Sequence, residues 1–307
     1  MNTLIVIAQK ALPVFVMLAL GMLCRKTNMI SREGVSAMKA FAVNITLPAV
    51  MLNAFATASY SRESLIVPLV IFTICVLMLL GGHALCRVMN IPGRLSPYLA
   101  TGFEAGMLGY ALFALLFPQE STSAFAMVDL GQVLFVFTLY KALLAGQGGL
   151  CGVLREAAHA PTVWAIAAGI LIGASGLYGA MTPSGLSGVL DAVTDFVAAP
   201  TSAVILLTIG YDLVPGEIRW RKTARLAALR LITGAAALAA VLLADRFILG
   251  SMMHPGALAL MFILPPPYVL PVFADVQEER TDVSSALSAL TLISLILFMA
   301  LTVAFSL

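Results

Sequence analysis

The stretch "ALALMFILPPPYVLPVFA", residues 257–274, is an apolar run about as long as a membrane-spanning helix, yet it contains four prolines between residues 263 and 271. Proline removes a backbone N–H donor and clashes with the preceding turn, at a cost of roughly 3 kcal/mol or more in a helix interior. Hydrocarbon cannot hydrogen-bond the backbone groups that such a break frees. The stretch therefore predicts an interrupted helix that other protein segments shield inside a membrane.

The composition of the whole chain indicates an all-α polytopic membrane protein. Of its 307 residues, 61% are hydrophobic and only 10% are charged, and the mean hydropathy is +1.02, whereas soluble domains carry about 25% charged residues. The net charge is +2, and the basic residues form short clusters between apolar runs. We therefore do not expect nucleic acid as a partner.

The four cysteines show no pattern of a metal or redox site. Cys24, Cys75, Cys86 and Cys151 form no CxxC pair and have no nearby histidine at metal-ligand spacing. Each falls in or beside an apolar run. We interpret all four as packing residues and expect neither a metal nor another cofactor.

The apolar runs divide the chain into ten predicted spans, because about 20 apolar residues are needed to cross the hydrocarbon core. The spans are residues 4–23, 35–56, 65–85, 97–117, 125–144, 161–178, 190–211, 226–243, 256–273 and 283–305.

Lysine and arginine are concentrated in alternate loops of this arrangement, and cytoplasmic loops carry an excess of them. The loops after the odd-numbered spans hold Arg25, Lys26, Arg32, Arg87, Arg94, Arg155, Arg219, Arg221, Lys222, Arg225 and Arg280. The other loops hold only Arg62 and Arg246. The pattern predicts that both termini face outward. The run "RWRKTARLAALR", residues 219–230, could also bind anionic membrane lipids.

Proline and glycine recur at similar positions in the two halves of the chain, which indicates an internal duplication. In spans one and six a proline precedes a glycine by eight residues, and spans two and seven each carry a proline within the helix. The matching positions are Pro13 and Gly21 with Pro161 and Gly169, and Pro48 with Pro200. Each half has five spans, an odd number, so the second copy must be inverted relative to the first. The prediction is a 5+5 inverted repeat.

Inverted repeats are typical of secondary transporters, in which discontinuous helices of the two halves meet near the membrane midplane and form the substrate site. The segment equivalent to the proline-rich one is "TGFEAGMLGYAL" in span four, where Gly102, Gly106 and Gly109 surround Glu104. We predict that spans four and nine are both broken and cross. Gly102 and Gly106 could alternatively form a helix-packing GxxxG motif, which is our interpretation of Gly169 and Gly173.

Glu104 lies near the centre of span four and Asp129 lies within span five, whereas Asp191 and Asp195 lie at the outer end of span seven. An ionisable group at this depth costs at least ~2.5 kcal/mol and marks a functional site by default. We predict that Glu104 gains and loses a proton as the site alternates between the two sides of the membrane. The alternatives are a structural carboxyl hydrogen-bonded to backbone that the glycines free, and, for Asp129, a polar contact between helices.

Three stretches resemble the auxin efflux carrier family, and the resemblance covers essentially the whole chain. They are "ALPVFVMLALGMLCRKTNMISREGVSAMKAFAVNITLPAVMLNAFA" (residues 11–56), "GMLGYAL" (residues 106–112) and "LPPPYVLPVFA" (residues 264–274). Family members often have a neutral polar residue near the position of Glu104, and plant members have a proline where this chain has Ala111.

The resemblance implies a ten-helix fold like that of sodium/bile acid symporters, with helices four and nine crossing at the substrate site. It implies a scaffold, often a dimer interface, from residues 1–60 and 161–213, and a moving transport domain from residues 61–145 and 214–307. Residues 146–160 would form a cytoplasmic linker. Bacterial members resemble carriers of small organic anions such as malonate or malate, and plant members export auxin.

These observations predict a proton-linked secondary transporter of a small carboxylate in the bacterial inner membrane, working by a rocking or elevator motion and not as an enzyme. The residues expected at its substrate site are Glu104, Gly106, Gly109, Asp129, Gln132, Pro265, Pro266, Pro267, Tyr268, Asn44 and Asn53. Asn44 and Asn53 could instead bond across helices.

Two alternatives remain open from the sequence. One is a carrier on the same fold that is coupled to sodium or that moves cations or amino acids, since Glu104 and Asp129 could hold a cation. The other is an intramembrane serine protease, because "GASG", residues 173–176, matches a Gly-x-Ser-Gly signature. Ser175 would then be the nucleophile and His254 a distant base.

Overall fold

The computed structural model describes residues 3–58, 60, 66–145, 160–213, 216, 220–270 and 279–305. The secondary structure of these residues is entirely helical. Seven of the described helical segments are long and apolar enough to span a membrane, or eight if two helices joined by a 72° bend, Pro161–Ala174 and Leu177–Ser184, form one span. The structure thus confirms an all-α protein with several membrane-span-like helices.

The spans found in this way match eight of the ten predicted segments. They are Arg32–Ala56, Ile66–Val88, Ser96–Leu116, Ser123–Leu144, Leu186–Asp212, Thr223–Leu249, Asp282–Ala304 and the bent pair. The first and ninth predicted segments are not among them. The ninth contains a short helix that ends where the prolines begin, and its remaining residues from 271 lie outside the described part, as do residues 146–159 of the predicted linker.

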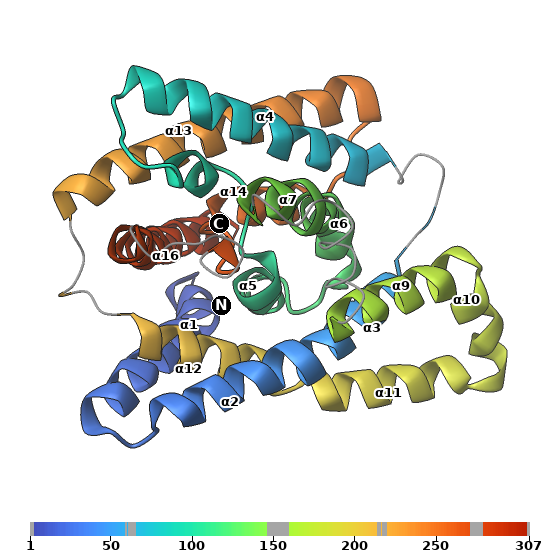
Figure 1. Ribbon diagram of the computed structural model, residues 1–307. Helices are drawn as coiled ribbons and strands as arrows, with labels where there is room; N and C mark the ends of the chain where they lie inside the picture. The colour runs from blue at the N-terminus through green and yellow to red at the C-terminus, as the bar shows by residue number, and fades with distance from the viewer. Residues whose placement is uncertain are drawn as a thin grey trace.

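One layer of helices, at the bottom of Figure 1, combines the first and the central parts of the chain. Its members are α1 (Thr3–Thr27), α2 (Arg32–Phe41), α3 (Leu47–Ala56), α9 (Pro161–Ala174), α10 (Leu177–Met181), α11 (Leu186–Ala198) and α12 (Thr201–Asp212). A π-helical turn, η1 (Ala42–Thr46), joins α2 to α3. We call this group the lower layer.

The remaining helices lie above it in Figure 1, with α4 (Ile66–Val88) and α13 (Trp220–Ala244) together at the top. Between them and the lower layer lie α5 (Tyr110–Leu116), α6 (Ser123–Phe135), α7 (Lys141–Ala145), α14 (Pro255–Ile263) and α16 (Arg280–Ala304). Short π or 3-10 turns adjoin them: η2 (Ser96–Ala100), η3 (Ala105–Gly109), η4 (Val136–Tyr140) and η7 (Asp245–Leu249).

Glycines set the closest contacts within the lower layer, where α1 packs along α12 and α9 along α3. A Cβ added to Gly21 would collide with the backbone of α12. A Cβ added to Gly169 would lie 2.8 Å from the Leu52 carbonyl oxygen, and one added to Gly173 would lie 2.6 Å from that of Phe55. Small residues allow such backbone approach between membrane helices, so the packing interpretation of Gly169 and Gly173 is confirmed.

The segment Ser96–Leu116 lies at the centre of the molecule, since 78% of its most apolar window is buried, more than in any other described span. Peripheral helices instead expose large apolar side chains: Phe196 on α11 is 83% exposed and Leu171 on α9 is 70% exposed. Such surfaces suit a helix bundle in lipid, whose hydrocarbon is as apolar as these side chains.

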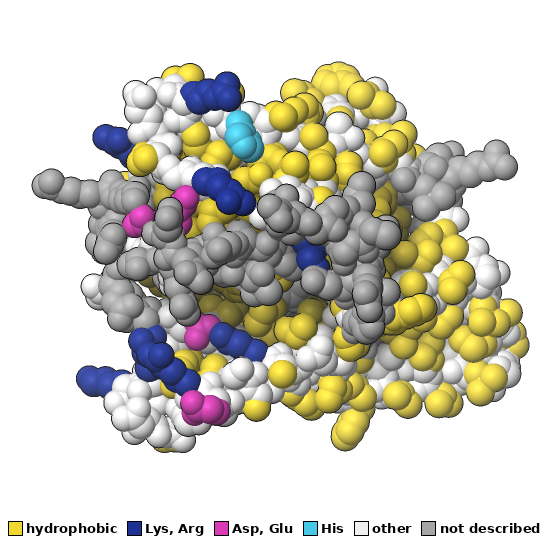
Figure 2. Space-filling model, viewed as in Figure 1, with side chains coloured by type: hydrophobic (Ala, Val, Ile, Leu, Met, Phe, Trp, Pro, Cys, Tyr) yellow, Lys and Arg dark blue, Asp and Glu magenta, His cyan; other side chains and the backbone are white. Residues whose placement is uncertain are grey.

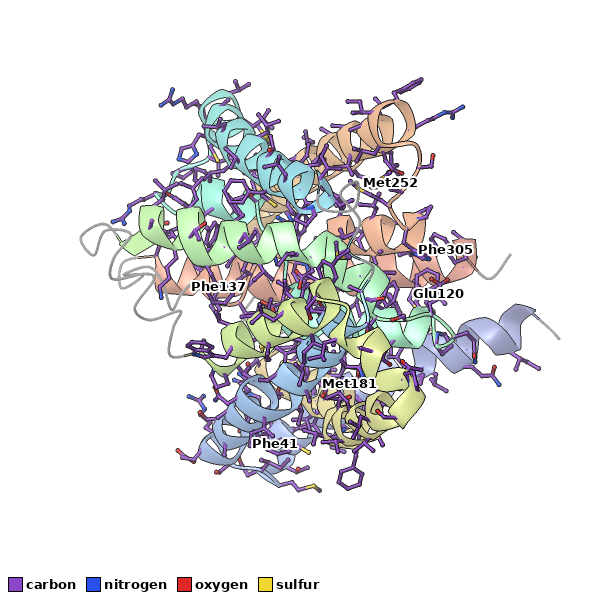
Figure 3. All side chains as sticks on the ribbon, turned by 90° about the vertical axis from the view of Figure 1, so that its right-hand side faces the viewer. Phe41, Glu120, Phe137, Met181, Met252 and Phe305 are labelled. Carbon is purple, nitrogen blue, oxygen red and sulfur yellow. The ribbon has the colours of Figure 1, made fainter. Side chains whose placement is uncertain are left out.

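Charged side chains are unevenly distributed over the surface. On the face drawn in Figure 2, most of the visible lysines and arginines lie toward the left, while the right-hand part is largely hydrophobic. Arg25 and Lys26 end α1, and Arg87 lies in the last turn of α4. Figure 3 shows Glu120, Met252 and Phe305 on one side of the molecule and Phe137 on the opposite side.

Candidate functional site

The segment Ser96–Leu116 is broken in its middle. The 3-10 turn η2 ends at Ala100, residues 101–104 are not helical, and η3 begins at Ala105. Gly102 has φ +68°, a conformation that side chains with a Cβ rarely adopt. A Cβ on Gly102 would also lie 2.8 Å from the Pro267 ring. Glycine therefore permits both the turn and the close approach of the proline-rich segment.

The proline-rich segment forms a second break. Helix α14 ends at Ile263, and Leu264 is extended with ψ 152°. Pro265, Pro266 and Pro267 follow, and none of them has an N–H to continue a helix. The Pro265 carbonyl oxygen accepts a hydrogen bond of 2.9 Å from the Glu104 backbone N–H. The two breaks are thus in direct contact.

The Glu104 side chain bridges the same two breaks. Its Oε1 accepts from the Met107 N–H at 3.0 Å, at the start of η3, and its Oε2 accepts from the Tyr268 N–H at 2.5 Å. The residue is only 7% exposed. A single carboxyl group therefore satisfies two partly buried backbone donors, one on each interrupted segment. A carboxylate near a helix N-terminus is also favoured by the helix dipole.

Asp129 and Gln132, one turn apart on α6, face the first break. Gln132 Nε2 donates to the Phe103 carbonyl oxygen at 2.8 Å and to Asp129 Oδ1 at 3.3 Å. Asp129 Oδ2 and Gln132 Oε1 are buried and have no hydrogen-bond partner among the described residues. Buried polar atoms are normally paired, and the hydroxyl group of Tyr110 on α5, which is also buried, interacts with the Asp129 carboxyl group.

Arg230 on α13 is a further charged group at the crossing, and the sequence analysis did not identify it. Its Nη2 donates to the Gly102 carbonyl oxygen at 2.7 Å and to that of Leu264 at 2.9 Å. Its guanidinium carbon lies 4.8 Å from the centre of the Phe103 ring. Arg230 is the last residue of the basic run 219–230 and was therefore interpreted together with the basic residues of that run. Its position inside the predicted span 226–243 could have identified it as an intramembrane charge.

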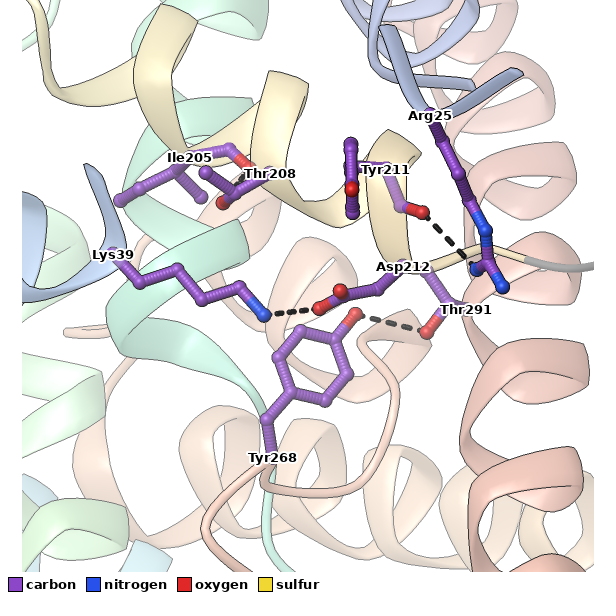
Figure 4. A network of polar contacts seen from close by, with 8 residues as sticks. All are labelled: Arg25, Lys39, Ile205, Thr208, Tyr211, Asp212, Tyr268 and Thr291. Atoms are coloured by element: carbon purple, nitrogen blue, oxygen red, sulfur yellow. Dashed lines mark hydrogen bonds and ion pairs between the residues drawn. The ribbon is translucent and has the colours of Figure 1, made fainter. Parts of the chain in front are cut away.

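Tyr268 lies where the second break meets the lower layer. Its hydroxyl forms a 2.8 Å hydrogen bond with Thr291 on α16. In Figure 4 the Tyr268 ring lies beside the ion pair between Lys39 on α2 and Asp212 on α12. The same figure shows Arg25 donating to the Tyr211 carbonyl oxygen. Polar side chains of both parts of the molecule thus come together around Tyr268.

The two other predicted glycines lie in η3, and only Gly109 is packed too closely to accept a Cβ. A Cβ on Gly109 would lie 2.7 Å from the Phe125 ring, and one on Gly106 would lie 3.6 Å from the Leu47 side chain on α3. Gly109 therefore serves packing within the central helices, while Gly106 faces the lower layer.

Asn44 and Asn53 are not brought to the breaks. Asn44 is exposed, and its Nδ2 donates to the Ala40 carbonyl oxygen one turn earlier. Asn53 donates to Asp191 Oδ1 at 3.0 Å and to Thr194 Oγ1 at 2.8 Å, both on α11. Asn53 thus follows the alternative interpretation, a hydrogen bond across helices within the lower layer.

The contacts of Ser175 and His254 give no support to a catalytic dyad. Ser175 Oγ donates to the Ile172 carbonyl oxygen at 3.2 Å. His254 Nδ1 accepts from the Ala257 N–H at 3.0 Å, and its Nε2 lies 2.6 Å from Glu120 Oε2. Both ring nitrogens are therefore engaged within their own surroundings.

In comparisons with known proteins, no family model matches the sequence and no curated protein matches it significantly.

Proposed function

We propose that the protein is a secondary active transporter of a small organic anion with one or two carboxylates. The observation that carries the proposal is the Glu104 carboxyl group, which occupies the Met107 and Tyr268 N–H donors at the meeting point of two interrupted segments. Non-helical backbone is tolerated at membrane depth where it is buried in protein or lines a cavity, and transporters bind substrate at such places.

The same two N–H groups suit a substrate carboxylate. For a substrate to take them, Glu104 must turn away or accept a proton, because an ionised Glu104 would repel a second carboxylate. Loading of the anion is then linked to protonation of Glu104. Gln132 Oε1, which has no hydrogen-bond partner among the described residues, could accept a hydrogen bond from a hydroxyl group of the substrate.

The helix contacts support a 5+5 inverted repeat of ten membrane helices. Two kinds of helix contact occur in both halves of the chain. Helix α1 packs on α12 as α9 packs on α3, and α4 packs on α6 as α13 packs on α16. In a 5+5 repeat, each of spans one to five is equivalent to the span five places later. The contact of spans 1 and 7 is then equivalent to that of spans 6 and 2, and the contact of spans 3 and 5 is equivalent to that of spans 8 and 10. Gly21 and Gly169, equivalent in sequence, each allow a close backbone approach, Gly21 between α1 and α12 and Gly169 between α9 and α3.

The lower layer corresponds to the scaffold and the other helices to the moving domain that the resemblance to auxin efflux carriers implies. Gly106 against Leu47, and Tyr268 beside Lys39 and Asp212, lie on the boundary that such a motion would use. The location in a bacterial inner membrane, the outward termini and a homodimer through the scaffold belong to the same proposal.

Uptake into proteoliposomes tests the proposal. Purified protein should accumulate radiolabelled malonate, malate or an indole acid, and an inward proton gradient should change the initial rate several-fold. Protein-free vesicles and the Glu104→Gln variant are the controls. The absence of uptake for every mono- and dicarboxylate tried, or the same rate with Glu104→Gln, would contradict the proposal.

A further inference from the structure

Arg230 makes contacts of a kind that bound cations make in transporters. The Gly102 and Leu264 carbonyl groups lie at the two breaks, where no helix can satisfy them, and one nitrogen of Arg230 donates to both. Unwound carbonyl groups and the C-terminal ends of half helices are the groups with which discontinuous transporter helices coordinate Na⁺. At the crossing, the guanidinium group therefore binds the free carbonyl groups, whereas Glu104 binds the free N–H groups.

We infer that Arg230 is a built-in cation that takes the place of a coupling sodium ion at this crossing. The inference rests on the proposed transport function and deepens it, because it assigns the ion. A carrier whose broken segments are held by a covalently attached cation does not need sodium to assemble its site. Transport should then be independent of sodium, and of the two coupling ions considered for this chain only the proton remains.

The surroundings of Arg230 agree with the role of a permanent cation. The residue is 5% exposed. No described carboxylate forms an ion pair with it, and its other contact is with the face of the Phe103 ring, which attracts cations. Nε and Nη1 have no hydrogen-bond partner among the described residues. A buried charge is costly unless it is paired and hydrogen-bonded, and the hydrogen bonds of this one go to carbonyl groups of both interrupted segments.

Arginine is also suited to this task by its chemistry. It stays protonated throughout the physiological pH range and offers donors in a fixed plane, so that one group reaches two acceptors at once. A lysine at the same position would supply the charge but not the planar NH₂ group whose two hydrogens reach both carbonyl oxygens. Replacing Arg230 by lysine therefore separates the charge of the side chain from its shape.

Thermal unfolding of the purified protein in NaCl, KCl and choline chloride of equal ionic strength tests the inference without any transport substrate. We expect the wild-type Tm to be the same in the three salts within about 1 °C, because ligands raise Tm only where they have a site to occupy. Arg230→Gln should lower Tm by about 5 °C or more. Arg230→Lys should lower it by less. Arg225→Gln, an exposed arginine on the same helix, is the matched control and should change little.

A Tm of the wild type that rises and saturates with Na⁺ would overturn the inference, since it would reveal a sodium site that Arg230 does not replace. Equal losses in Arg230→Lys and Arg230→Gln would also overturn it, because the charge would then be irrelevant. If Arg230→Gln does not fold, Arg230→Lys and the wild-type salt series still decide. These readouts do not depend on uptake, so a failure of the transport proposal is recognised separately.

Discussion

Glu104 holds two segments of the chain together through one side chain. Each of its oxygens accepts from a partly buried backbone N–H, one in η3 and one at Tyr268. Hydrogen bonds to a charged group contribute about 1.5–3 kcal/mol each, more than bonds between neutral groups. Glu104 therefore stabilises the contact between the two segments. In the proposed mechanism it also has a functional role, because a substrate must compete for the N–H donors that Glu104 occupies.

Replacing Glu104 by glutamine should therefore reduce both stability and transport. A glutamine has one carbonyl oxygen, so its NH₂ group would face one of the two N–H donors. We expect Glu104→Gln to lower Tm by about 5 °C or more and to abolish the dependence of uptake on the pH gradient. Scanning fluorimetry and proteoliposome uptake measure the two effects.

The matched control for this change is Glu33→Gln, which alters an exposed carboxyl group in the first turn of α2. It should leave Tm and uptake nearly unchanged. Should Glu104→Gln transport like the wild type with the same pH response, Glu104 would have only a structural role.

At the scale of elements, the two breaks depend on different chemistry. Prolines end α14 because they lack N–H groups, whereas the break in Ser96–Leu116 depends on the backbone freedom of Gly102. The contact of Gly102 with Pro267 joins the two effects. Neither break would be stable in lipid by itself, and each supplies partners for the freed groups of the other.

A pair of matched alanine variants separates the φ requirement from this contact. Gly102 and Gly250 have nearly the same φ, +68° and +69°, but a Cβ on Gly250 would meet nothing within 4 Å. Both variants pay the cost of a left-handed alanine, about 1–2 kcal/mol. Gly102→Ala should lose several degrees more in Tm and most of the uptake rate. Equal effects of the two variants would show that the contact with Pro267 is unimportant.

Much of this local structure could be predicted from the sequence, because proline, glycine and intramembrane carboxyl groups act locally. The breaks at residues 101–104 and 264–267 and the pair Asp129 and Gln132 lie where these residues indicated. The role of Arg230 depends on which helix covers the crossing, a tertiary fact that periodicity does not contain. Asn53 likewise found a partner in Asp191, distant in the sequence.

At the scale of the whole molecule, the layers mix distant parts of the chain. The lower layer combines residues near the N-terminus with residues 161–212, and α4 lies beside α13 at the opposite face (Figure 1). The composition predicted a membrane-embedded protein, and the apolar runs predicted most of the span positions. The described helices do not give the count of ten spans, because the first predicted segment is not among the span-like helices and the segment with the prolines contains only a nine-residue helix.

The proposed sidedness can be tested with single cysteines. In a variant without the four native cysteines, Met29→Cys and Met252→Cys would place thiols at positions that are 70% and 45% exposed. The predicted topology puts Met29 in the cytoplasm and Met252 outside. A membrane-impermeant maleimide should label Met252→Cys in intact cells and Met29→Cys only after permeabilisation. Labelling of both from the same side would show that an even number of spans separates them.

The Glu104 bridge has a consequence for the empty molecule. If the protein is the proposed carrier, its Glu104 carboxyl group already satisfies the donors that a substrate would use, so the unloaded state has no unpaired N–H at these two positions to favour one conformation. We therefore expect the unloaded carrier to return across the membrane without cargo and to catalyse net flux instead of obligatory exchange. Efflux from preloaded vesicles should then proceed at a similar rate with or without substrate on the far side, and efflux that requires external substrate would exclude this cycle.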